Sequence, residues 1–165
     1  MMASGKTTSG RLVAQRLGWG YLDSDEQVEA RTGRTVKQIF EKEGEAAFRK
    51  EEREALEAAL AEGQPLVIAV AGGAVLDPAN RDLLQQAGGT IAWLRARPET
   101  LAARVAASGQ GHRPLLADDP EVTLRRLDAE RRPIYEGLAD VIVDVEGRTV
   151  EEIAEHLVLH LKDAS

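Results

Sequence analysis

The stretch SGKTTSGRLVAQRL, residues 4–17, decides how this chain folds. Its first residues match the closing half of the phosphate-binding pattern G-x-x-x-x-G-K-[ST], whose first glycine would lie one position before Met1. Where a glycine turn opens a helix, unpaired backbone N–H groups hold phosphate, a lysine (Lys6) reaches the β- and γ-phosphates, and a hydroxyl (Thr7) coordinates Mg²⁺. The match is therefore either accidental or the remainder of a nucleotide site whose first strand is absent.

Strand-like and helix-like segments alternate along the rest of the chain, which is typical of an α/β fold with a parallel sheet. The apolar run LVIAVA at residues 66–71 predicts a strand buried on both faces. Further strands are expected at residues 20–22, 90–94 and 140–145. Helices are expected at residues 7–17, 24–31, 36–42, 45–62, 77–86, 98–107, 121–138 and 149–162. We predict one domain, residues 1–165, in which helices cover both faces of the sheet in three layers.

Composition excludes several classes of function. The formal charge of −7 argues against nucleic-acid or membrane-surface binding, both of which favour a basic face. The chain has no cysteine, and its three histidines predict no zinc cluster. No apolar run is long enough to span a bilayer, so a cytoplasmic protein is expected.

Polar and glycine residues follow two of the predicted strands. Asp23 and Asp25 follow residues 20–22, and Gly72 and Gly73 follow residues 66–71. Ligands collect beyond the carboxyl ends of parallel strands, so these residues should share one rim with the phosphate turn. Each also has a structural explanation, namely N-capping by Ser24 or Asp25 and a tight turn at the glycines. The phosphate turn, the aspartates and the glycines together on one rim favour a ligand-binding site.

Three arginines are candidates for binding an anion. Arg131 lies on the apolar stripe of its helix, where a guanidinium must meet an anion or bear a desolvation cost. Arg49 could instead pair with Glu45 and Glu52 on a solvated helix. Arg113, in a polar glycine-bearing segment, is either a loop residue or a mobile arginine over a phosphate site.

Several motifs, in order along nearly the whole chain, resemble the shikimate kinase family of P-loop kinases, which have the nucleoside-monophosphate-kinase-like fold. The segment YLDSDEQVEARTGRTVKQIFEKEGEAAFRKEE is similar to the family's shikimate-binding region. AGGAVL resembles its glycine triplet, HRPLL its lid and ERRPIY its second substrate arginine.

The resemblance implies a monomeric kinase that uses ATP and Mg²⁺ to phosphorylate the 3-hydroxyl of shikimate in aromatic amino-acid biosynthesis. It implies a substrate-binding region at about residues 23–62 and a lid at about 108–118. Asp25 would orient the substrate hydroxyl and accept its proton, while Thr7 and Asp23 would hold the metal. Lys6 and Arg113 would act on the transferring phosphoryl group. Shikimate would contact Asp25, Arg49, Gly72, Gly73 and Arg131, and the nucleotide would contact Ala3, Ser4, Gly5, Lys6, Thr7, Thr8, Arg104 and Arg113.

The chain departs from the family pattern in two places. Ala71 stands where the first glycine of the triplet is usual, and its methyl group could crowd the pocket or be harmless. The family's first strand, which would lie between the strands beginning near Leu66 and Thr90, is absent. Each buried N–H or C=O left unpaired there would cost about 1–3 kcal/mol. We therefore expect Met1 and Met2 to be internal residues of a longer protein.

Two other functions fit parts of the pattern. A gluconate kinase would also need arginines for a carboxylate-bearing polyol, although the G-E-x-x-F-R motif favours shikimate. A catalytically inactive relative that only binds a ligand is the other alternative. The joint presence of Lys6, Asp25, Arg49, Arg113 and Arg131 argues against it, since none of them is needed for the core.

Overall fold

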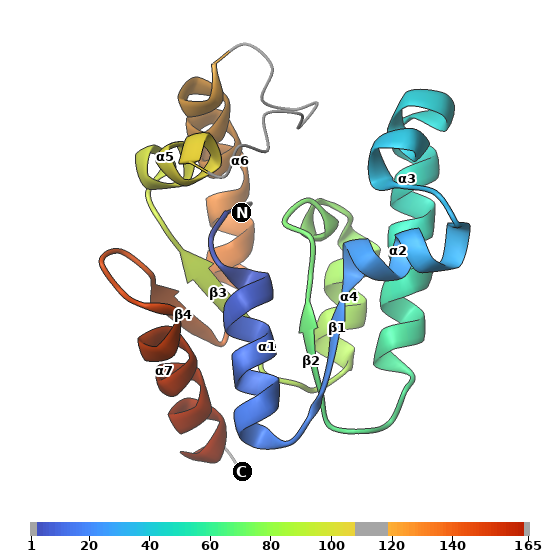
Figure 1. Ribbon diagram of the computed structural model, residues 1–165. Coiled ribbons are helices and arrows are strands. Elements are labelled where there is room, and N and C mark those ends of the chain that lie inside the picture. Colours follow the sequence, from blue (N-terminus) through green and yellow to red (C-terminus); the bar gives the residue numbers. More distant parts are fainter. Residues whose placement is uncertain (1–2, 108–118, 164–165) are drawn as a thin grey trace.

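The computed structural model describes residues 3–107 and 119–163. In these residues the helices and strands alternate as the sequence predicts (Figure 1). The elements are α1 (Lys6–Leu17), β1 (Gly20–Asp23), α2 (Ser24–Thr32), α3 (Val36–Leu60), β2 (Leu66–Ala69), the 3₁₀ turn η1 (Ala74–Leu76), α4 (Pro78–Gln86), β3 (Ala92–Arg95), α5 (Pro98–Ala107), α6 (Pro120–Leu138), β4 (Val141–Asp144) and α7 (Val150–Asp163).

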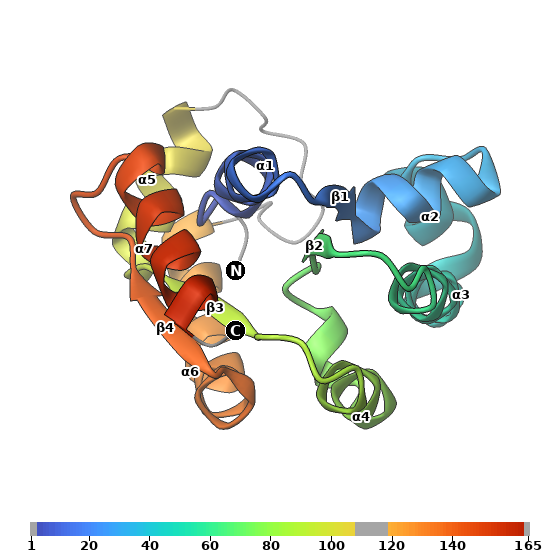
Figure 2. The same cartoon turned by 90° about the horizontal axis from the view of Figure 1, so that it is seen from below.

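The helices form two outer layers. Figure 2 shows α1 and α7 on one side of the strands and α4 and α6 on the other, so the expected three-layer α/β architecture is confirmed. The main buried cluster joins β3 and β4 to α5, α6 and α7 through residues such as Trp93, Leu101, Leu124 and Val143. A second cluster packs α2 against α3 around Val28 and Ile39.

The strands pair in two separate halves within the described part of the chain. Strand β1 runs parallel to β2, with Gly20 opposite Leu66, and β3 runs parallel to β4, with Ala92 opposite Val141. No pairing joins β2 to β3 among the described residues. The expected interruption of the sheet between these two strands is confirmed.

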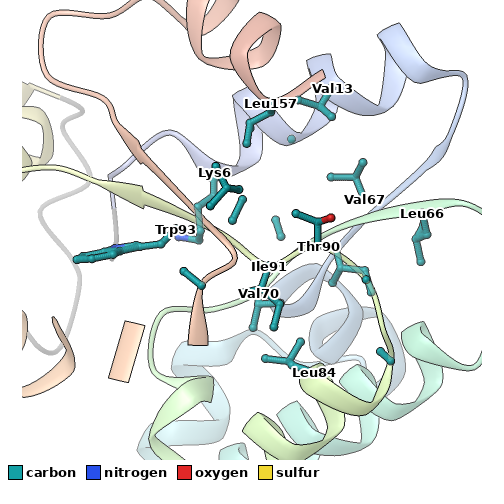
Figure 3. Close-up of a pocket in the computed structure, with 18 of the residues that line it drawn as sticks. Lys6, Val13, Leu66, Val67, Val70, Leu84, Thr90, Ile91, Trp93 and Leu157 are labelled. Carbon is teal, nitrogen blue, oxygen red and sulfur yellow. The ribbon is translucent and has the colours of Figure 1, made fainter. Parts of the chain in front are cut away.

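A mostly apolar cavity of about 570 Å³ lies between the two halves. Figure 3 shows Val67, Val70 and Ile91 among the side chains that line it, with Leu157 toward the top of the view. Lys6 lines the cavity from the start of α1 (Figure 3). The cavity therefore separates the sheet halves and reaches the phosphate turn at one end.

The predicted helix break at Gly44 is confirmed. Residues 36–42 and 45–62 were expected to form two helices, and the span of α3 consists of two helical segments that meet at a kink at Gly44. Gly44 has φ 84° and ψ 176°, a conformation outside the helical region that glycine adopts without a Cβ clash. No helix in the described residues is long and apolar enough to cross a membrane.

Candidate active site

The phosphate turn is built by a glycine at the start of α1. Gly5 has φ 89°, in the left-handed region, and α1 has no side-chain cap in the described structure. The backbone N–H groups of its first turn therefore face outward at the positive end of the helix dipole, which suits a phosphate. Ala3, just before, also has a positive φ of 56°. Its carbonyl accepts a hydrogen bond from Arg104 Nη1 at 3.4 Å, which ties the turn to α5.

A hydroxyl and a carboxylate meet beside this turn. Thr7 Oγ1 donates to Asp23 Oδ2 at 3.1 Å, and Tyr21 donates to the same oxygen at 3.3 Å. Burial, aided by the charge of Asp23, raises the pKa of Tyr21 to about 12. Magnesium prefers oxygen ligands and is held by few protein groups when phosphates and waters complete its shell. Thr7 and Asp23 have this chemistry, and no larger metal-binding cluster of acidic or histidine residues occurs in residues 3–107 and 119–163.

Asp23 also begins the next helix. Its Oδ1 accepts a hydrogen bond from the backbone N–H of Asp25 at 3.1 Å, so Asp23 is the N-cap of α2. The expectation that Ser24 or Asp25 would serve as the cap is wrong, because the strand β1 runs one residue further than predicted. The side chain of Asp25 is therefore not used in capping and lies in the first turn of α2.

Asp25 sits among charged groups at this rim. Desolvation by the surrounding protein raises the pKa of its carboxyl, and the negative charge of Asp23 adds to this effect. The nearby positive charges of Lys6 and Arg49 act in the opposite direction. A carboxylate with a raised pKa beside a phosphate site is a candidate general base.

Arg49 is held by two carboxylates on α3. Its Nη1 donates to Glu52 Oε2 at 2.8 Å, and its Nη2 donates to Glu45 Oε1 at 3.2 Å. Burial disfavours the charged guanidinium, but these contacts outweigh it and raise the pKa of Arg49. Glu52 is fully buried, so this face of α3 is not the solvated surface that the alternative required. A Cβ on Gly73 would lie 2.6 Å from Arg49 Nη2, which places the guanidinium directly against the glycine turn.

Arg131 points inward from α6, as its position on the apolar stripe predicted. Its exposed fraction is 7%, and its Nε has no hydrogen-bond partner in the described structure. Burial raises the pKa of Glu52, while the charges of Arg49 and Arg131 oppose that rise. One oxygen of Glu52, Oε1, also lacks a partner. Two arginines therefore share one buried carboxylate.

The tyrosine one turn after Arg131 reaches the glycine turn. Tyr135 donates a hydrogen bond to the carbonyl of Gly72 at 2.7 Å, and its ring packs against Trp93 with centroids 5.3 Å apart. Neither Glu52 nor Tyr135 was predicted as part of the site. Both lie on otherwise apolar helix stripes, which is the signal that identified Arg131.

The structure thus brings most of the predicted residues to one rim. Asp25 interacts electrostatically with Lys6, Asp23 and Arg49 there, and Thr7 donates a hydrogen bond to Asp23. Gly72, Gly73 and Arg131 complete the group through Tyr135 and Arg49. Ser4 is buried in the phosphate turn, and Thr8 is exposed in the first turn of α1.

Arg113 and the lid at about residues 108–118 lie outside the described residues. Arg104 donates to the carbonyls of Ala3 and Val145, so its guanidinium braces the phosphate turn. Ala71 adopts no positive φ, and its N–H donates to Ser24 Oγ at 2.9 Å. The methyl group in place of a glycine hydrogen therefore causes no backbone strain.

An α/β sheet edge with a glycine–lysine turn and an adjacent carboxylate defines a P-loop kinase fold. A family model described as shikimate kinase matches residues 2–162. The chain is 44% identical to a shikimate kinase of Symbiobacterium thermophilum over 99% of this chain and 93% of the relative. It superposes on a shikimate kinase from Acinetobacter baumannii in complex with shikimate with a TM-score of 0.92 and 34% identity, over 99% and 90% of the two chains. The chain belongs to the shikimate kinase family.

A gluconokinase from Sinorhizobium meliloti is a more distant match. Its TM-score is 0.63 at 18% identity, over 99% of this chain and 89% of that one. At this identity the likeness extends to the fold alone.

Proposed function

We propose that this chain transfers the γ-phosphoryl group of ATP to the 3-hydroxyl of shikimate, giving shikimate 3-phosphate for aromatic amino-acid biosynthesis. The observation that carries the proposal is the cluster of Asp25, Arg49, Arg131 and the glycine turn beside the phosphate turn. In a member of this family, that cluster supplies an anion-binding pair and a base at the end of a nucleotide site.

The nucleotide phosphates bind at the start of α1. Backbone N–H groups from the turn at Gly5 hold the phosphates, and Lys6 neutralises charge on the β- and γ-phosphates. Thr7 and Asp23, whose side chains are hydrogen-bonded to each other, would hold Mg²⁺. The metal, when bound, draws charge from the phosphate oxygens.

Asp25 orients the acceptor hydroxyl and takes its proton. As the hydroxyl oxygen forms its bond to the γ-phosphorus, the bond from that phosphorus to the bridging oxygen breaks and ADP leaves. The proton of the hydroxyl passes to the Asp25 carboxylate. Desolvation raises the pKa of this carboxyl, which makes its carboxylate a better base than an unperturbed aspartate, and the positive charges of Lys6 and Arg49 oppose that rise.

Arg49 and Arg131 bind the shikimate carboxylate. Both guanidiniums interact with one buried carboxylate, Glu52, and Arg49 also pairs with Glu45, whose side chain is largely exposed. Charge-assisted hydrogen bonds from arginine to a carboxylate are the stronger class of such bonds. Gly72 and Gly73 allow the backbone to approach the substrate closely.

The remaining roles follow the family pattern. We assign the substrate-binding region to residues 23–62 and closure over the phosphates to the lid near Arg113, within a single kinase domain. We also assign Arg104 to the nucleotide site, where its hydrogen bond to the Ala3 carbonyl braces the phosphate turn. The enzyme acts as a monomer in the cytoplasm, and light scattering after gel filtration, with localisation of a tagged chain, tests this assignment.

The position of the transferred phosphate tests the proposal. After incubation with Mg-ATP and shikimate, ³¹P NMR with proton correlation should place the new phosphate on the 3-hydroxyl. Shikimate methyl ester is the matched control, because it keeps the ring hydroxyls and removes the charge that Arg49 and Arg131 would bind. Equal turnover of the ester, or phosphate at another position, would contradict the proposed geometry.

A further inference from the structure

Tyr135 occupies a place in the site that the proposed reaction does not use. It lies on α6 one helical turn after Arg131, and only 7% of its surface is exposed. Its hydroxyl makes a 2.7 Å hydrogen bond to the carbonyl of Gly72, a residue 63 positions earlier in the chain. A buried tyrosine hydroxyl usually finds a partner, but here the partner belongs to the turn that borders the substrate site.

The glycine turn is held from two sides. Arg49, from α3, lies against Gly73 so closely that a Cβ there would clash with the guanidinium. Tyr135, from α6, holds Gly72 through its hydroxyl. The turn is therefore fixed between the two helices that carry the two arginines.

Tyr135 also interacts with Arg131. Burial raises the pKa of Tyr135, and the charge of Arg131 opposes that rise, which places the guanidinium next to the phenol. The Nε of Arg131 has no hydrogen-bond partner among the described residues. Trp93 packs against the Tyr135 ring and fixes the ring from behind.

We propose that Tyr135 is a positioning residue that couples Arg131 to the glycine turn. The carboxylate and the ring of shikimate then bind to Arg131 and Gly72 in one fixed arrangement. Tyr135 does not itself touch substrate in this arrangement. It acts through Arg131 and Gly72, and the inference rests on the proposed function because it assumes that these two residues bind shikimate. The ATP site, built on α1, does not depend on it.

The test removes the hydroxyl alone. Tyr135→Phe keeps the ring and its contact with Trp93, but deletes the bond to Gly72. A neutral hydrogen bond is worth about 0.5–1.5 kcal/mol, so KM for shikimate and the calorimetric Kd should each rise about 2- to 12-fold. KM for ATP should stay within twofold of wild type, and the melting temperature should fall by only a few degrees. A matching rise in both KM values would overturn the proposal.

A double-mutant cycle separates coupling from a general structural effect. If Tyr135 acts through Arg131, Tyr135→Phe should change the shikimate Kd less than twofold in an Arg131→Ala background. Full, additive losses would show that the two residues act independently and would overturn the coupling. The inference alone fails if wild type turns over shikimate and Tyr135→Phe is unchanged. Absence of shikimate-dependent turnover in wild type would instead refute the proposed function.

Discussion

Replacing Arg131 with alanine should weaken shikimate binding far more than ATP binding. Arg131 is only 7% exposed, and its guanidinium is proposed to bind the substrate carboxylate. A hydrogen bond to a charged group contributes about 1.5–3 kcal/mol. The expected loss is therefore about 10- to 150-fold in KM for shikimate.

The assay measures ADP release by a coupled reaction, varying shikimate at saturating Mg-ATP and then varying Mg-ATP at saturating shikimate. Arg132→Ala is the matched control, because Arg132 is the next residue on α6 but its side chain is 38% exposed and pairs with Asp128. The control should keep wild-type KM for shikimate. Equal losses for both substrates, or an equal loss in Arg132→Ala, would show that Arg131 has only a structural role.

Asp25 gives two further predictions, and Ala3 and the apolar cavity give one each. Asp25→Asn should lower kcat by about 100- to 10,000-fold while leaving ATP affinity within twofold, as measured by calorimetry. Because folding raises the pKa of Asp25, its contribution to stability is complete below the unfolded-state pKa of about 3.9 and is lost as pH rises through the folded value. Asp25→Asn should accordingly raise the melting temperature at pH 7, whereas an unchanged or lower value would contradict the raised pKa. Ala3→Gly relieves a positive φ that costs an L-residue about 1–2 kcal/mol, so it should stabilise the fold in thermal denaturation; destabilisation would show that the turn is unstrained. The apolar cavity between Val67 and Ile91 should bind the dye ANS under native conditions, and a fluorescence signal no greater than that of a close-packed control protein would mean that the cavity is closed in solution.

Much of the fold could be predicted because the sequence is locally consistent. Apolar runs such as residues 66–69 are bounded by glycine and proline, and helix ends coincide with capping residues such as Asp77 and Asp119. The break between residues 36–42 and 45–62 could also be predicted, because a glycine such as Gly44 adopts a backbone conformation outside the helical region without a Cβ clash.

The site was predictable where residues follow strands, and less so on the helices. Asp25, Gly72 and Gly73 were found because the ends of parallel strands converge at one edge. Glu52 was missed because α3 is rich in glutamate, and its spacing from Arg49 matches a surface ion pair. Glu52 lies, however, on the buried stripe of α3 that includes Phe48 and Leu56. A charged carboxylate on a buried stripe needs a partner of opposite charge, as the buried Arg131 does.

The central claim is that this rim binds shikimate and phosphorylates it. The most direct measurement is the rate of ADP release from Mg-ATP with shikimate, with D-gluconate and with no acceptor. The account predicts ADP release above background with shikimate alone, and its loss in Asp25→Asn. Equal ADP release in all three conditions, or a dependence on gluconate, would contradict it.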